Sequence, residues 1–134
     1  MSWLKSLLQH DTRTRVLAIT ANDSDHIALQ GIAARARWDL KFAPGPEGAA
    51  ETLKHLPAAV VLCDRDLPGL DWRDTLRRIR ETSPSSAIVV MAPHTDDHFW
   101  LEVIERGGFG VVTRPFHENR LIVTVRQAAL QPTK

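Results

Sequence analysis

Cysteine is nearly missing from the sequence. Cys63 is the single cysteine among 134 residues, so an internal disulfide is excluded. The fold must therefore be stabilised by its hydrophobic core, as is usual for proteins of the reducing cytosol, and we expect a cytoplasmic protein. Cys63 lies within an apolar run, which is typical of a small core residue and not of a reactive thiol.

Long apolar runs and an excess of one charge are missing as well. No stretch approaches the roughly 20 apolar residues that a membrane-spanning helix needs. The 17 basic and 16 acidic residues give a formal net charge of +1, which offers no general argument for nucleic acid, a membrane surface or an acidic partner. We therefore expect no nucleic acid and no membrane among the partners.

What the sequence does contain is enough for one globular domain. Hydrophobic residues make up 43% and charged residues 25% of the chain, which is ordinary for a globular protein, and the length suits a single domain. Residues 1–13 place a tryptophan and three leucines at helical spacing. We expect residues 1–13 to form an amphipathic extension that docks on the domain or on a second copy, and residues 14–131 to form the domain.

Apolar runs alternate along the chain with segments of helical periodicity. The apolar runs are Val16–Thr20, Leu40–Ala43, Ala59–Cys63, Ala87–Met91 and Gly110–Thr113, and the helical segments are Asp25–Trp38, Pro46–His55, Asp71–Glu81, Asp96–Arg106 and Glu118–Leu130. Three of the runs are almost continuous, which is typical of strands that are covered on both faces. The alternation predicts an α/β fold of three layers, with a five-stranded parallel sheet between helices.

Two polar segments follow strands in this pattern. Residues 20–25 follow the first strand, and residues 64–69 follow the third strand. In parallel sheets of this kind, ligands bind beyond the carboxyl ends of the strands, where the strand order reverses. If the first and third strands are neighbours, the carboxylate of Asp64 faces a crevice at this edge and escapes the core.

Two motifs carry a resemblance to a known family. The pattern Asp64-x-x-x-Pro68-Gly69 follows the third apolar run, and Thr113-Arg114-Pro115-Phe116 follows the fifth, where the family usually has lysine, proline and phenylalanine. From Arg15 to Leu130 the chain resembles the receiver domain of bacterial two-component response regulators. The resemblance implies a doubly wound, flavodoxin-like fold with strand order 2-1-3-4-5, and a cis peptide bond between Arg114 and Pro115.

The same resemblance implies a function in phosphorelay signal transduction. The partners would be a histidine kinase or phosphotransfer protein, a downstream protein and, for many receivers, a second copy in a homodimer. Asp64 matches the aspartate that accepts a phosphoryl group from a kinase histidine. We expect a signalling module and not an enzyme.

The residues that should hold Mg²⁺ depart from the family pattern. The acidic pair of the family falls on Thr20-Ala21 or Ala21-Asn22, and neither supplies two carboxylates. Asp23 and Asp25 lie just beyond these positions, and Asp66, whose carbonyl matches a metal contact, lies two residues after Asp64. Because Mg²⁺ is usually held by one or two carboxylates together with phosphate oxygens, we expect a weak or absent site built from Asp64, Asp66 and Asp23.

The two neighbours of the phosphoryl group have also changed. Ala92 stands where the family has threonine or serine, so a hydrogen bond worth about 1.5–3 kcal/mol is lost. Arg114 stands where the family has lysine, and its guanidinium keeps the positive charge. A resting ion pair between Arg114 and Asp64 would replace the metal ion as the counter-charge.

Three functions remain open at this point. The chain is an atypical receiver that is phosphorylated at Asp64, or it is a pseudo-receiver that binds proteins without phosphorylation. The third is a phosphatase, because the pair Asp64 and Asp66 after an apolar strand also resembles the nucleophile and acid of haloacid-dehalogenase-like phosphatases. That motif normally opens its fold, whereas two strand–helix repeats precede it here, so we place the phosphatase last.

Two further features bear on partners. Trp72 and Trp100 are predicted on the third and fourth helices, and we interpret them as apolar anchors for a protein partner, with plain packing of either ring as the alternative. The third helix is also basic, with Arg73, Arg77 and neighbouring arginines. A solvated face is the default interpretation of these arginines, and a docking surface for an acidic partner is the alternative.

Overall fold

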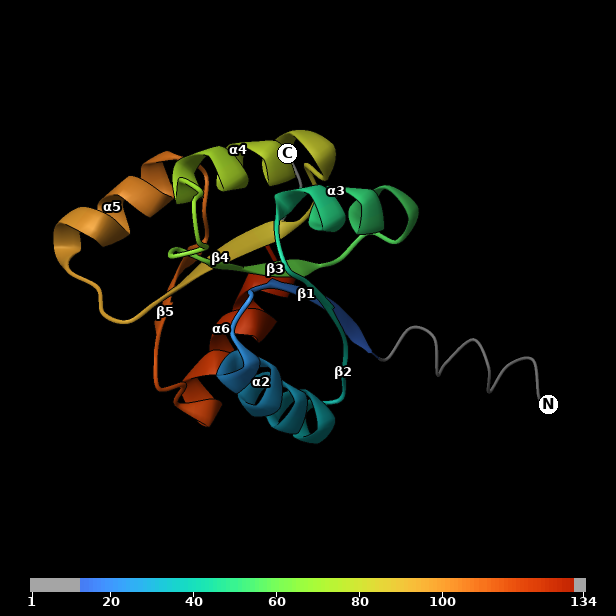
Figure 1. Cartoon of the computed structure of the whole chain (residues 1–134). Coiled ribbons are helices and arrows are strands. Elements are labelled where there is room, and N and C mark those ends of the chain that lie inside the picture. The colour runs from blue at the N-terminus through green and yellow to red at the C-terminus, as the bar shows by residue number, and fades with distance from the viewer. Residues whose placement is uncertain (1–12, 132–134) are drawn as a thin grey trace.

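The chain folds around one parallel sheet. The computed structural model describes residues 13–131, so the expected extension 1–13 lies outside the described residues except for its last one. The strands are β1 (Thr14–Ile19), β2 (Trp38–Ala43), β3 (Val60–Asp64), β4 (Ala87–Ala92) and β5 (Gly110–Thr113), in the order β2-β1-β3-β4-β5 (Figure 1). All four strand pairings are parallel, so the predicted fold and strand order are confirmed.

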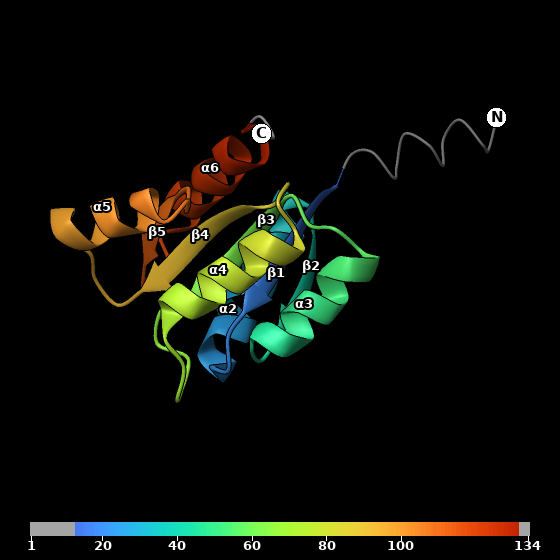
Figure 2. The same cartoon turned by 90° about the horizontal axis from the view of Figure 1, so that it is seen from above.

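Five helices cover the two faces of the sheet. The helices are α2 (Asp23–Ala36), α3 (Pro46–His55), α4 (Trp72–Thr82), α5 (Asp97–Glu105) and α6 (Glu118–Ala129). Figures 1 and 2 show α2 and α6 on one face, and α3, α4 and α5 on the other. Within residues 13–131, no helix is both long and apolar enough to cross a membrane.

The core is divided into two clusters by the sheet. Alternate residues of β3 face opposite sides: Val61 and Cys63 pack with α3 and α4, whereas Val60 and Leu62 pack with α2 and α6. All four of these side chains are buried. Burial on both faces explains why the central strands read as nearly continuous apolar runs.

The first helix differs from the prediction at both ends. The Asn22 side chain accepts a hydrogen bond from the backbone N–H of Ser24, so α2 begins at Asp23 and not at Asp25. At the other end Arg37 adopts a left-handed conformation with φ 61°, which ends the helix. Trp38 therefore begins β2 and is buried in the core, and the prediction that it ends a helix is wrong.

The predicted starts of α4 and α5 are confirmed by their caps. The carboxylate of Asp71 accepts from the Arg73 N–H, and that of Asp96 accepts from the Phe99 N–H. The predicted stop of α5 is also confirmed, because Gly107 follows its last turn with φ +94°, a conformation that favours glycine. The starts of α4 and α5 fix the loops that follow β3 and β4 at the carboxyl edge of the sheet, where the candidate site lies.

Candidate functional site

Asp64 is the last residue of β3 and lies at the edge where the strand order reverses. The registers pair Ile19 with Cys63 and Asp64 with Met91, so the end of β3 is flanked by the ends of β1 and β4. The prediction that the first and third strands are neighbours is therefore confirmed. Only 7% of Asp64 is exposed, so its carboxylate requires partners within the fold.

Arg114 supplies the positive charge at this edge. Its Nε donates to Asp25 Oδ1 at 2.9 Å, and its Nη2 donates to Asp25 Oδ2 at 2.8 Å. The same Nη2 lies 3.3 Å from Asp64 Oδ1. The predicted pairing of Arg114 with Asp64 is present, but the bidentate partner of the guanidinium is Asp25. We call these three side chains the Asp25–Arg114–Asp64 network.

Asp25 is held from two sides. The Thr20 hydroxyl donates to Asp25 Oδ2 at 2.8 Å and accepts from the Asn22 N–H at 3.1 Å, which ties the end of β1 to the first turn of α2. Burial acts to raise the pKa of the Asp25 carboxyl, but hydrogen bonds from Arg114 and Thr20 outweigh it and leave the pKa below its ordinary value. Asp25 is therefore a buried anion that depends on its neighbours.

The Asp64 carboxylate has one engaged and one free oxygen. Both of its contacts use Oδ1, which accepts from the Asp66 N–H at 2.9 Å and lies beside Arg114. Among residues 13–131, no hydrogen bond reaches Asp64 Oδ2, and every buried side-chain polar atom has a partner. It follows that Oδ2 reaches the surface.

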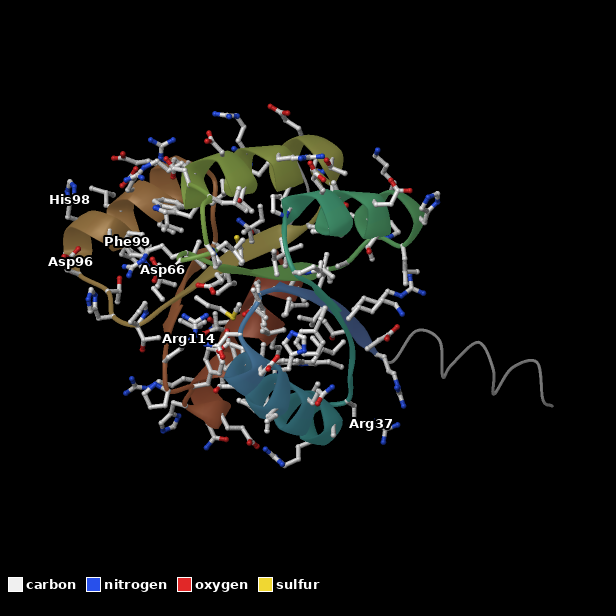
Figure 3. The ribbon with its side chains drawn as sticks, viewed as in Figure 1. Arg37, Asp66, Asp96, His98, Phe99 and Arg114 are labelled. Carbon is white, nitrogen blue, oxygen red and sulfur yellow. The ribbon has the colours of Figure 1, made fainter. Side chains whose placement is uncertain are left out.

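The other residues expected around Asp64 lie elsewhere. Asp23 is exposed in the first turn of α2, and Asp66 is exposed with its carboxylate bound by the Arg65 guanidinium at 3.0 and 3.1 Å. In Figure 3, Asp66 lies toward Phe99 and α5, whereas Arg114 lies toward α2. We predicted Asp23 beside Asp64, but Asp25 is the aspartate of α2 that joins the site. The side-chain cap of Asn22, which starts α2 at Asp23, is the sequence signal that distinguishes the two aspartates.

Ala92 and the peptide after Arg114 complete the edge. Ala92 ends β4 and is fully buried, and its carbonyl accepts from the Arg114 N–H at 3.0 Å. Its methyl group offers no hydrogen bond to a ligand. The predicted cis peptide bond between Arg114 and Pro115 is confirmed.

The side chains do not fit the metal ion that the receiver resemblance implies. Both carboxylate oxygens of Asp25 are bound by Arg114 and Thr20, and both oxygens of Asp66 are bound by Arg65. In the part of the chain that the structure describes, no three His, Cys, Asp or Glu residues are grouped so that they could hold a metal ion. The charge beside Asp64 is instead that of a guanidinium.

The two tryptophans that we interpreted as partner anchors differ. Trp72 is 7% exposed, and its ring packs edge-on against Phe99 at a centroid distance of 5.3 Å, so its interpretation as a surface anchor is wrong. It is the first residue of α4, and its side chain joins the core beneath α3 and α4. Trp100 remains 47% exposed on α5, next to Leu101 at 49%.

Comparison with known proteins gives the family. The sequence model of the family described as the response regulator receiver domain matches residues 36–126, which is more than half of the chain. The chain belongs to the receiver domain family. Receiver domains are signalling modules of two-component systems, so the predicted family and signalling class are confirmed.

Relatives and solved structures agree with this assignment. The receiver domain is 35% identical over 81 residues to the hydrogenase transcriptional regulatory protein HoxA of Cupriavidus necator, covering 60% of this chain and 17% of HoxA. The chain thus spans about a fifth of the length of the curated relatives it matches.

Two solved structures share the fold. The chemotaxis response regulator CheY4 of Vibrio cholerae has a TM-score of 0.78 at 18% identity, over 87% of this chain and 99% of CheY4. The beryllofluoride-activated NtrC4 receiver domain, described as a dimer, has a TM-score of 0.77 at 24% identity, over 85% of this chain and 94% of that one.

Proposed function

We propose that this receiver domain is an atypical one that binds protein partners of a two-component pathway without phosphorylation. The observation that carries the proposal is the position of the Arg114 guanidinium, which makes two hydrogen bonds to Asp25 and lies 3.3 Å from Asp64. Asp64 is then a structural anion of the resting fold. The partners we propose are a kinase or phosphotransfer protein, a downstream protein, and a second copy through exposed apolar residues such as Trp100 and Leu101.

The energetics of the network support this proposal. A phosphoryl group on Asp64 needs a cation, and Arg114 is the cation that lies beside the Asp64 carboxylate. To follow the phosphoryl oxygens, Arg114 would have to leave Asp25, which is 2% exposed. Removing one partner of a buried ion pair costs about 3–5 kcal/mol. Ala92 offers no hydroxyl group to offset this cost.

The free oxygen of Asp64 supports a second candidate, a receiver that is phosphorylated. Oδ2 of Asp64 would attack the phosphorus of an acyl or histidyl phosphate, forming the aspartyl phosphate while the bond to the carboxylate or imidazole leaving group breaks. Arg114 would then be the counter-charge for the phosphoryl oxygens. A phosphatase is less well supported, because the proton donor it needs, Asp66, is bound by Arg65.

One experiment separates these candidates. The full chain is incubated with acetyl phosphate, with and without Mg²⁺, and its intact mass is measured beside that of Asp64→Asn. We expect no gain of a phosphoryl mass under either condition. A gain that Asp64→Asn abolishes would establish the phosphorylated receiver and overturn the proposal, and steady release of phosphate from p-nitrophenyl phosphate would identify a phosphatase.

A further inference from the structure

A basic groove lies along α4, beside the residue that follows α5 and away from the Asp25–Arg114–Asp64 network. It has a volume of about 410 Å³ and is lined by Arg73, Leu76, Arg77, Arg80, Glu81 and Arg106. Four of these six residues are arginines. Figure 1 shows the two helices next to one another on the same face of the sheet.

Two of the arginines that line the groove already bind a carboxylate beside it. Arg73 of α4 and Arg106, which follows α5, both donate to the side chain of Glu102, whose exposed fraction is 22%. Hydrogen bonds from Arg73, followed by those from Arg106, lower the pKa of Glu102 to about 2. An acidic side chain of α5 is therefore held as an anion by an arginine of α4 and by the arginine that follows α5.

The arginines farther along α4 are less engaged. Arg80 donates to the backbone carbonyl of Arg106 at 3.2 Å, and among residues 13–131 it has no acidic partner. Arg77 pairs with Asp74, but both side chains are 65% exposed, so water screens the pair and it holds Arg77 only weakly. Because a guanidinium carries five N–H donors, Arg77 and Arg80 keep donors for an external anion.

We propose that this arginine groove binds an acidic segment of a partner protein. Arg73, Arg77 and Arg80 are spaced i, i+4 and i+7, so they form a row about 10 Å long on one face of α4. Glutamates at this spacing on a helical segment would meet the guanidiniums of Arg77 and Arg80 as Glu102 meets those of Arg73 and Arg106. The inference rests on the proposed function, in which partner binding is the purpose of the domain.

The test uses the full chain and a matched pair of variants. The probe is a short helical peptide with glutamates at i, i+4 and i+7 among alanines, and its control has glutamine in place of glutamate. Binding is followed by amide chemical shifts. Arg77→Glu changes the groove, whereas Arg78→Glu reverses the charge of the next residue, which is also exposed and does not line it.

We expect the glutamate peptide to cause saturable changes in the amide chemical shifts of α4 and α5. The affinity for this peptide should fall as salt is added, because the Debye length shrinks. Arg77→Glu should weaken binding about tenfold, and Arg78→Glu less than about twofold. Equal loss in both variants, or equal binding of the glutamine peptide, would overturn the proposal. So would a single-stranded oligonucleotide that binds with the same dependence on Arg77. A phosphoryl gain at Asp64 would overturn the proposed function without altering any of these readings.

Discussion

At the scale of single residues, the site depends on one cation shared by two carboxylates. Arg114 comes from the segment after β5, Asp25 from α2 and Asp64 from β3, so the network joins three elements that are far apart in sequence. The Asp25 and Asp64 side chains are 3% and 10% exposed, respectively. Replacing the guanidinium would leave two buried anions without a counter-charge, which is far more costly than losing an exposed pair.

Arg114→Met should lower the free energy of unfolding by about 3 kcal/mol at neutral pH, measured by urea denaturation. The sign of the pH dependence follows from Asp25. Its pKa in the folded state lies below the ordinary 3.8, so the stability from its ionised form is present above that value and is lost as the pH falls through the folded pKa. The gap between wild type and variant should therefore narrow as the pH falls below about 4.

The control is the same substitution in an exposed pair. Arg35→Met breaks the ion pair between Arg35 and Glu118, whose side chains are 61% and 36% exposed. It should lower the free energy of unfolding far less than Arg114→Met does, because water screens an exposed pair. Equal losses in the two variants would show that the network contributes no more than a surface ion pair.

The site could be predicted from the sequence only in part. The motifs around Asp64 and Arg114 indicated a pair, and the structure contains it. We predicted Asp23 and not Asp25 as the aspartate near Asp64, because the choice between them depends on where α2 begins. A start at Asp23, set by the Asn22 cap, turns Asp25 toward the sheet and leaves Asp23 in solvent. A boundary error of two residues is ordinary for sequence patterns, but on a helix it changes the face on which a side chain lies.

At the scale of elements, α5 ends in a contact with its neighbour. The guanidinium of Arg80 on α4 donates to the carbonyl of Arg106, the residue that caps α5. Gly107 lies directly beneath that guanidinium, and a Cβ atom there would overlap it. The end of one helix is thus fixed by a side chain of another, and a glycine makes the close approach feasible.

Gly107→Ala should destabilise the fold by about 1–2 kcal/mol, because alanine is strained at φ +94° and displaces Arg80. Gly110→Ala is the matched control. A Cβ at Gly110 would meet nothing within 4 Å, and its φ lies outside the strained region, so it should shift stability by less than about 0.5 kcal/mol. Thermal unfolding of both variants measures this, and a neutral Gly107→Ala would contradict the assigned role of Arg80.

Most element boundaries were accessible from the sequence because their signals are local. Asp71 and Asp96 act as caps through their own side chains, and Gly107 stops α5 through its own backbone. The end of α2 was missed because Arg37 adopts a left-handed conformation that its residue type does not predict. The place of Trp38 at the start of β2 depends on its packing in the core, and the periodicity of the sequence gives no information on such packing.

At the scale of the whole molecule, one sheet separates two apolar clusters. Ile32 of α2 belongs to the cluster under α2 and α6, whereas Ile79 of α4 belongs to the cluster under α3 and α4. The alternation of strands and helices predicted this arrangement, since a sheet covered on both faces needs helices on both. The strand order came from the resemblance, because periodicity alone does not say which strands pair.

The two clusters should contribute independently to one cooperative transition. Ile32→Val and Ile79→Val should each cost about 1 kcal/mol, and the double variant should equal their sum within about 0.5 kcal/mol. Denaturant unfolding with unchanged m-values measures this. A double-variant loss that differs from the sum of the single losses by more than about 0.5 kcal/mol would show that the two clusters are coupled through the sheet.

The lone thiol of the chain has a practical consequence. Cys63 is 1% exposed, and burial, together with the charge of Asp64, raises its pKa to about 12. A maleimide or iodoacetamide reagent needs both access and thiolate, so native molecules should react only when β3 detaches from its neighbours. The alkylation rate of the unmodified protein thus reports how often the strand around Cys63 opens, without any dye or engineered tag.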